Sequence, residues 1–403
     1  MAGFSSKKKV LSPGPIVLVV HCVDTEGPIG GDVRRHPDGS KEFMGNWDDI
    51  KTTLNDITVD EFRQQNSDSF ENPFMLNWFI MDFTGFKTNP KERIQAYNDT
   101  YDNIKSLNTS LDSFHWHYHQ PPKTGVGDQW SDDWNSSNEH YNILGHRLLD
   151  RQDFPEVFRA GGAIEDNKCS LWLEDNLMID YSNRVSYRSC PTDNIFDFSW
   201  YNSPSHWGYY HPSKDDLICP GQMKRHVVRC VDLRSRLHEL QSWEVNEAFG
   251  YALMFSKPII LSYFSHDHRD MRAETYHVIK LVQEASRNYG VPFEWCDAKE
   301  ALQKSAGLIP KNVKIGFERQ NDLRLMIHFG ESIYQKHPFV FTRMSDGDIQ
   351  YHKLDLEYVP NCPYYLCRTF LETTPDMKQV GVACTSTSGD KSIKVLDLGR
   401  VIT

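Results

Sequence analysis

Three histidines occupy alternate positions in the segment FHWHYHQPP, residues 114–122. Imidazole is the commonest protein ligand for a borderline divalent metal ion, and it binds through either ring nitrogen. In an extended backbone His115, His117 and His119 project to one side, whereas in a helical turn His115 and His119 share a face. Both conformations predict that His115 and His119 converge on one ion. A histidine-rich surface loop without a metal is the alternative interpretation.

A third ligand must come from another part of the chain. The apolar run Ile16–Val20 continues into HCVDTEGP, which predicts a buried strand that ends in a turn carrying Asp24 and Glu26. Ligand sites of α/β folds lie at the carboxyl ends of the strands. A carboxylate in this turn is therefore a candidate metal ligand, although both acids could simply solvate the strand end.

Other polar residues also follow predicted strands or helices, namely Arg159, Asp180 and His266. Each has an ordinary interpretation when taken singly: a surface ion pair, a turn residue and the N-terminus of a charged helix. Their joint placement predicts instead that they share one site with Asp24 and Glu26.

The elements that would position these residues alternate between strands and helices. Beyond the first strand, we expect strands at 74–80, 157–159, 227–231, 258–264 and 291–295, and helices from Pro90 and at 138–149, 169–178, 235–255 and 271–288. The polar stretch 30–69 reads as a long excursion. Such alternation predicts a mostly parallel sheet or barrel covered by helices.

The pattern changes after about Ile309, where short apolar runs with a period of two replace the helical pattern. They predict strands at 313–317, 323–329, 339–342, 351–356, 364–370, 381–384 and 393–398. Several such strands with polar turns are typical of an antiparallel β-sandwich. The predicted fold class is therefore α/β, with a catalytic domain at 1–308 and a small all-β sandwich domain at 309–403.

Over roughly residues 16–300 the chain resembles the polysaccharide deacetylases, the metal-dependent carbohydrate esterase superfamily. The motifs that carry the resemblance, in the family's order, are DTE at 24–26, HWHYHQP at 115–121, FRAGG at 158–162, LWLEDNLMIDYS at 171–182 and SYFSHDHRD at 262–270. The resemblance implies a distorted (β/α) barrel. It also implies a metal-dependent hydrolase that removes an acyl group, above all N-acetyl, from a sugar or a sugar-containing precursor.

By the same resemblance, Glu26, His115 and His119 hold one divalent ion, zinc or a similar metal. Glu26 stands where the family more often has aspartate, which only lengthens the ligand arm by a methylene. Three protein ligands leave positions open for water and for the acyl oxygen of the substrate.

The remaining motifs imply the catalytic roles. The base, the arginine that keeps it ionised and the general acid would be Asp24, Arg159 and His266, with Asp267 or another carboxylate raising the pKa of the histidine. His268 competes with His266 for the acid role. Glycines replace the proline and aromatic residue usual after the arginine, and the backbone N–H of Gly162 is predicted to stabilise an oxyanion.

The segment FDFSWYNSPSHWGYYHP, residues 196–212, is dense in aromatic residues and has no helical or strand period. Sugar rings stack on aromatic faces, so Trp200 and Trp207 are predicted to bind substrate. A hydrophobic cover over the end of the sheet is the equally weighted alternative.

Composition restricts the partners. A net charge of -11 argues against nucleic acid and anionic membranes, because both demand a basic face. No apolar run approaches the roughly 20 residues of a membrane span. The nine cysteines include no CxxC pair, which favours a reduced, cytoplasmic protein. Without a recognisable secretion signal, the expected substrate is an acylated precursor in surface polysaccharide biosynthesis.

Two rival functions stay open. The string HxHQP at 117–121 also resembles a motif of certain barrel glycoside hydrolases, which use paired carboxylates and need no metal, although there the motif follows the first strand. The other rival is a catalytically silent carbohydrate-binding protein that keeps the fold. Stoichiometric metal separates the deacetylase from the glycosidase, and turnover separates it from the silent protein.

Overall fold

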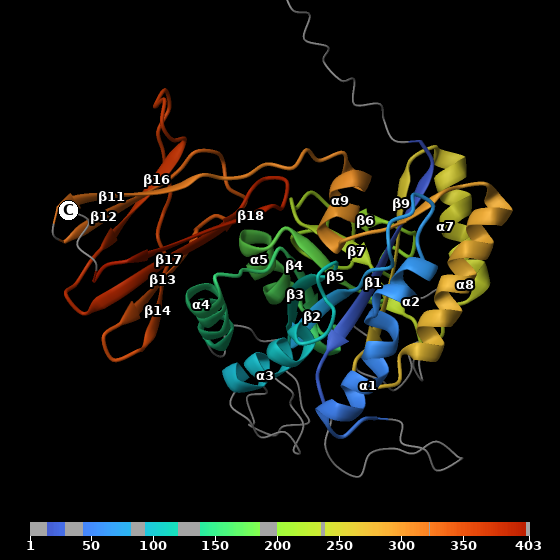
Figure 1. Cartoon of the computed structure of the whole chain (residues 1–403). Coiled ribbons are helices and arrows are strands. Elements are labelled where there is room, and N and C mark those ends of the chain that lie inside the picture. Colours follow the sequence, from blue (N-terminus) through green and yellow to red (C-terminus); the bar gives the residue numbers. More distant parts are fainter. Residues whose placement is uncertain are drawn as a thin grey trace, which may run out of the picture.

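The structure is a computed structural model, and it describes residues 14–28, 43–81, 93–119, 138–185, 200–234, 238–321 and 323–399. The predicted helix start at Pro90, the end of the histidine segment at 120–122 and the first part of the aromatic segment at 196–199 lie outside these ranges. Within them, the chain is a mixed α/β protein with a large curved sheet and two small antiparallel sheets (Figure 1).

The large sheet is mostly parallel. Its strands are β1 (Ile16–Thr25), β2 (Asn77–Met81), β3 (Ser113–Tyr118), β4 (Val157–Ala160), β5 (Ile179–Asn183), β6 (Tyr209–Tyr210), β7 (His226–Arg229), β8 (Val231–Asp232), β9 (Pro258–His266) and β10 (Phe293–Trp295). Their order is β6-β7-β5-β4-β3-β2-β1-β9-β8, with β10 beside the first half of β1. β6 is the antiparallel strand, at the edge beside β7.

The two edges of this sheet are joined by one short piece of chain. β7 lies next to the edge strand β6 and pairs with β5, whereas β8 pairs with β9 at the other edge, and Cys230 alone separates β7 from β8. Ser262 of β9 donates a hydrogen bond to the carbonyl of Arg229, which ties the junction to β9. Residues 226–232 therefore bring both edges of the curved sheet together.

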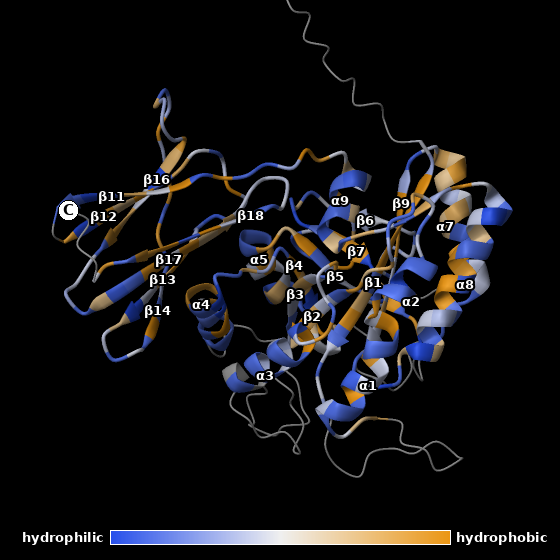
Figure 2. Cartoon of the chain, viewed as in Figure 1, coloured by the Kyte–Doolittle hydropathy of each residue, from blue (hydrophilic) through white to orange (hydrophobic). Residues whose placement is uncertain are grey.

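Side chains of β1 alternate between two cores, because successive residues of a strand point to opposite faces. Val17, Val19 and Val23 pack outward against the covering helices. Leu18 and Val20, together with Cys22, pack inside the curve of the sheet. An almost continuous β-branched run of this kind is typical of a strand buried on both faces. Apolar residues also line strands such as β7 and β9 (Figure 2).

Helices cover the outer face of the large sheet (Figure 1). They are α1 (Trp47–Thr58), α2 (Asp60–Gln65), α3 (Arg93–Lys105), α4 (Glu139–Arg151), α5 (Asn167–Asn176), α7 (Ser242–Phe255) and α8 (Arg272–Tyr289). A further helix, α9 (Ala298–Ala306), packs Ala298, Ala301 and Leu302 into the inner cluster with Leu18 and Val20. Helices α1 and α2 lie between β1 and β2, in the stretch predicted to be a long excursion, and the prediction did not identify them as helices. Ile50, Leu54 and Ile57 form a narrow buried stripe among polar residues, and Asn46 caps α1 through the N–H of Asp49.

The antiparallel strands predicted after Ile309 are present. One sheet has the order β11 (Ile315–Asn321), β12 (Arg324–Phe329), β16 (Cys367–Glu372), β15 (Glu357–Tyr358), and the other has the order β14 (Ile349–His352), β13 (Phe339–Met344), β17 (Met377–Thr385), β18 (Lys391–Asp397). Apolar side chains of both sheets, such as Ile327 and Val382, form a core between them.

The second of these sheets is buried on both faces. Its other face packs against α4, where Phe339 and Phe341 of β13 join one apolar cluster with Leu144 and Leu148 of the helix. Beside this cluster the rings of Tyr141 and Tyr351 stack with centroids 4.0 Å apart. The residues before and after the predicted boundary at 308–309 therefore share a core.

Candidate metal centre

The residues of the site come from the carboxyl ends of β1, β3 and β4. Asp24 and Glu26 continue the face of β1 that points inside the curve of the sheet, and Glu26 lies one residue beyond the strand. On β3, His117 is the last residue whose side chain points to this inner side of the sheet, and His119 lies one residue beyond the strand. In the β3–β4 pair, His117 is in register with Arg159. The alternation of the strands thus directs all of these side chains toward one region.

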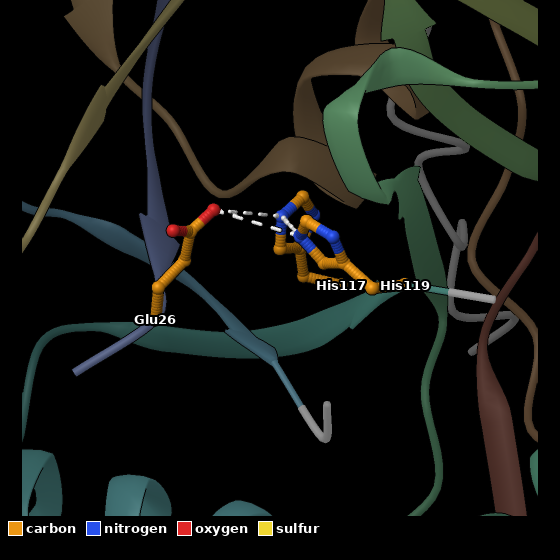
Figure 3. A group of neighbouring side chains, drawn as sticks. All are labelled: Glu26, His117 and His119. Atoms are coloured by element: carbon orange, nitrogen blue, oxygen red, sulfur yellow. Dashed lines mark hydrogen bonds and ion pairs between the residues drawn. The ribbon is translucent and has the colours of Figure 1, made fainter. Parts of the chain in front are cut away.

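Glu26, His117 and His119 form a group that can hold a metal ion. The two Nε2 atoms of His117 and His119 lie 3.0 Å apart, and Glu26 Oε1 lies 3.7 Å from the first and 3.5 Å from the second. Figure 3 shows the carboxylate facing both imidazoles. All three side chains are buried, with at most 7% of any residue exposed. Little water competes with an ion here.

The three separations agree with the size of a zinc-like ion. A point about 2 Å from all three atoms exists for a triangle with these sides, and zinc binds imidazole nitrogen and carboxylate oxygen at about 2.0–2.2 Å. Three protein ligands with an open fourth position are typical of a catalytic zinc site, whereas structural sites are closed by four ligands. The donor set therefore fits one divalent ion.

A hydrogen bond to the backbone fixes the tautomer of His117. Its Nδ1 lies 3.1 Å from the carbonyl oxygen of Arg159, so Nδ1 donates and Nε2 keeps its lone pair. The Nε2 of His119 faces that lone pair, and a cation between the two nitrogens satisfies both. Metal-binding histidines commonly donate their second nitrogen to a carbonyl in this way.

The backbone around the other two ligands is also fixed. Asp267 accepts hydrogen bonds from the N–H of Glu26 at 2.8 Å and from that of Gly27 at 3.0 and 3.1 Å, which holds the turn after β1. At Gly161 there is no room for a side chain, because a Cβ there would lie 2.8 Å from Cα of His119 and closer still to its ring. The glycine in FRAGG thus lets the imidazole lie on the backbone of the turn after β4.

Asp24 and Arg159 form a buried ion pair beside the metal group. Nε of Arg159 lies 2.7 and 3.0 Å from the two oxygens of Asp24, and Nη1 donates to the carbonyl of Tyr181 at 2.7 Å. The guanidinium also lies over the ring of Phe264, with 3.6 Å from its carbon to the centroid. Asp24 is 3.8 Å from Nδ1 of His117, so its carboxylate borders the metal group without belonging to it.

The electrostatics of the group favour an anionic Glu26 beside the two imidazoles. Burial would raise the pKa of Glu26, but its interactions with His117 and His119 hold that pKa well below the usual value. Burial also opposes charge on His117, and the carboxylates of Asp24 and Glu26 outweigh it and raise its pKa. Burial lowers the pKa of His119. A cation among these groups takes the place of protons on the imidazoles.

The two histidines of the last motif face different carboxylates. His266 ends β9 in register with Asp24, and its Nε2 is 3.9 Å from Asp24 Oδ2. His268 Nδ1 is 3.5 Å from Glu26 Oε2, and burial lowers the pKa of His268 to about 4. The carboxylate predicted to support His266 is not Asp267, since Asp267 is bonded to the turn after β1.

His115 does not join the metal group, and His117 takes the place predicted for it. The Nε2 of His115 lies 2.9 Å from Ser113 Oγ and 3.5 Å from Asp297 Oδ2. The reason is depth: a strand rises about 3.3 Å per residue, so His115 starts roughly 13 Å from His119 along β3. Residues on one face of a strand share a direction, but only the last of them reach the site.

Trp200 and Trp207 are packing residues, which is the alternative stated for the aromatic segment. They are 1% and 2% exposed. Trp200 Nε1 donates to the carbonyl of Ala163 at 2.7 Å, and Trp207 Nε1 donates to that of Glu244 at 2.9 Å. Arg229 lies over the ring of Trp207. Neither indole offers a free face, so the predicted stacking on sugar rings does not fit this structure.

Two further predicted residues, Gly162 and Asp180, belong to the segment from β4 to β5. Gly162 is half-buried in the 3-10 turn that follows β4 and has a left-handed backbone conformation, with φ of 59°. Asp180 is the second residue of β5, where it pairs with Arg225 and accepts a hydrogen bond from Ser182. Asp180 therefore supports the sheet and does not contact the metal group.

No protein-family model matches this chain, and no curated protein matches it at a significant level. Within the described residues, no helix has both the length and the apolar character that crossing a bilayer requires.

Proposed function

We propose that this protein is a metal-dependent hydrolase that removes an acyl group, most often N-acetyl, from a sugar or sugar-containing precursor. We further propose that its curved sheet is a distorted (β/α) barrel of the polysaccharide deacetylase type. The observation that carries the proposal is the buried Glu26, His117 and His119 group directly beside the Asp24–Arg159 pair. A ligand set with a carboxylate beside it to act as base is what hydrolysis of an amide at a metal requires.

Each group has a role in this reaction. Glu26, His117 and His119 would hold the ion, which when bound polarises the acyl carbonyl and acidifies water. Asp24 takes a proton from the attacking water, and Arg159 donates to both of its oxygens and so holds the carboxylate in one orientation. The carbonyl of Arg159 orients His117 as well, so one residue links the base to a ligand.

The electrostatics favour this function over a glycoside hydrolase. A glycosidase needs one carboxyl group with a raised pKa to act as acid. The carboxylates that face the group are Asp24, bound to a guanidinium, and Glu26, whose pKa is held well below its usual value. Burial raises the pKa of the adjacent Asp267 to about 7, but this carboxyl group is fully buried and accepts hydrogen bonds from the N–H groups of Glu26 and Gly27, so it does not face a substrate.

The test is elemental analysis of protein purified without chelator, followed by assays on N-acetylated and O-acetylated sugars. We expect one divalent ion per chain and release of acetate that stops when the ion is removed and returns when it is restored. Metal-free protein that hydrolyses glycosidic bonds would refute the proposal, as would a tightly bound metal without turnover on any acylated sugar.

A further inference from the structure

Arg269 makes a hydrogen bond with the histidine at the end of β9. Its Nη2 lies 2.9 Å from Nδ1 of His266, and its Nη1 donates to the carbonyl of Arg234 at 2.7 Å. A guanidinium has five donors and no acceptor. His266 Nδ1 must therefore accept this bond, and a ring that accepts at Nδ1 carries its proton on Nε2.

The protonated nitrogen of His266 is the one that lies next to Asp24, the proposed base. His266 Nε2 is the atom 3.9 Å from Asp24 Oδ2, and the two residues are in register on neighbouring strands. This separation is longer than a hydrogen bond. The N–H is thus near Asp24 without being bonded to it, and 21% of the His266 side chain is exposed.

We propose that Arg269 is a positioning residue that keeps His266 neutral with its proton on Nε2, so that His266 serves the reaction as a hydrogen-bond donor and not as an imidazolium acid. The part concerning the reaction rests on the proposed function above. The part concerning the tautomer rests on the contacts of Arg269 alone.

The charges around His266 agree with a neutral ring. Burial, and then the guanidinium of Arg269, lower the pKa of His266 well below its usual value. The carboxylate of Glu26 acts in the opposite direction, but His268 and Arg159 add to the lowering. Asp24 on β1 faces Nε2 and is itself bound by Arg159, so its charge is already paired.

A neutral imidazole is too weak an acid to give up its Nε2 proton to a leaving amine, so the proton must come from Asp24. The oxygen of water forms a bond to the acyl carbon, and its proton passes to Asp24. The carbon–nitrogen bond then breaks with its electron pair on nitrogen, which takes that proton from Asp24. The products are a carboxylic acid and an amine, so atoms and charge balance. The Nε2–H of His266 stabilises charge that develops on oxygen or nitrogen beside it.

The tautomer can be read by NMR on protein labelled with nitrogen-15 histidine, with the His266 signal identified by its loss in His266→Gln. We expect a proton on Nε2, none on Nδ1, and no titration between about pH 5.5 and 8.5 in the wild type. Arg269→Met removes the donor and should mix the tautomers and bring titration into that range, whereas Arg269→Lys keeps a donor and should behave like the wild type. Arg272→Met is the matched control, because Arg272 pairs with Asp270 and Asp56 on the surface.

A wild-type ring that carries its proton on Nδ1, or that titrates near pH 6.5, would overturn the proposal. Because this measurement needs no substrate, it separates a failure here from a failure of the proposed function. In an active enzyme, His266→Gln keeps an N–H donor and should retain at least about tenfold more kcat than His266→Ala. An alkaline limb of kcat/KM that disappears in His266→Gln would assign the acid role to His266 and contradict the inference.

Discussion

Replacing Gly161 with alanine should damage the metal site through one methyl group. The backbone of Gly161 is not in the left-handed region, so alanine meets no conformational obstacle there. The obstacle is space, because the new Cβ would lie 2.8 Å from Cα of His119 and closer to its ring. Ordinary carbon–carbon contacts begin near 3.5 Å, so the imidazole must move by roughly 1 Å.

A shift of that size exceeds what a metal site tolerates, since ligand distances hold to about 0.2 Å. We expect Gly161→Ala to lose zinc affinity by at least a hundredfold and to lower the free energy of unfolding of the metal-free protein by about 1–3 kcal/mol through overpacking. Zinc affinity can be measured by competition with a chelator, and stability by urea unfolding. Gly250→Ala is the control, because its Cβ would meet Tyr289 at an ordinary 3.5 Å. Unchanged affinity in Gly161→Ala would show that His119 is not a ligand in the observed position.

Four further outcomes follow from the structure. His117→Ala should abolish stoichiometric metal while His115→Ala retains it, by elemental analysis; the reverse would restore the original assignment of His115. Asp24→Asn should bind metal normally and lose kcat by several orders of magnitude, and a loss below tenfold would place the base elsewhere. A chain ending near residue 309 should be insoluble or unfolded by circular dichroism, because it exposes the apolar face of α4. Burial beside Asp180 raises the pKa of Glu165 from 4.5 to about 8, so this group stabilises the fold fully below pH 4.5 and loses that contribution as the pH rises through 8. Glu165→Gln should flatten that part of the pH dependence of the urea midpoint, and an unchanged slope would contradict the raised pKa.

The sequence predicted the class of the fold and the residue types of the site, because both depend on local patterns. The two-residue period of the strands and the positions of these residues at strand ends were enough to predict that Asp24, Glu26 and Arg159 lie in one region. The two-residue period of a β-strand does not distinguish His115 from His117 as the metal ligand, because both side chains lie on one face of β3. Their depth depends on where β3 ends and on how it pairs with β4, and only the pairing of His117 with Arg159 decides it.

Local sequence patterns could not predict contacts between loops that lie far apart in the chain. Nothing local shows that Asp267 holds the turn after β1, that Gly161 lies against His119, or that Arg269 reaches Nδ1 of His266. The glycine pair at 161–162 is visible in the sequence, but only the structure shows that Gly161 lies against the ligand His119. The sequence could not show whether Trp200 stacks on a sugar or packs in the core, because this depends on whether its N–H has a buried acceptor. The carbonyl of Ala163 is that acceptor.

The shared core of the C-terminal sheets did leave a trace in the sequence. A strand exposed on one face alternates apolar and polar residues, whereas a strand covered on both faces is apolar throughout. Phe339, Val340 and Phe341 are consecutive and all fully buried. Val340 faces the core between the two small sheets, and the phenylalanines face α4. An unbroken apolar run in an otherwise alternating β region therefore indicates a second partner for that sheet, and here the partner is the helix that follows the histidine segment in the chain. Because α4 leads directly into β4, which carries Arg159, the C-terminal sheets support the frame of the metal site without contributing a residue to the Glu26, His117 and His119 group.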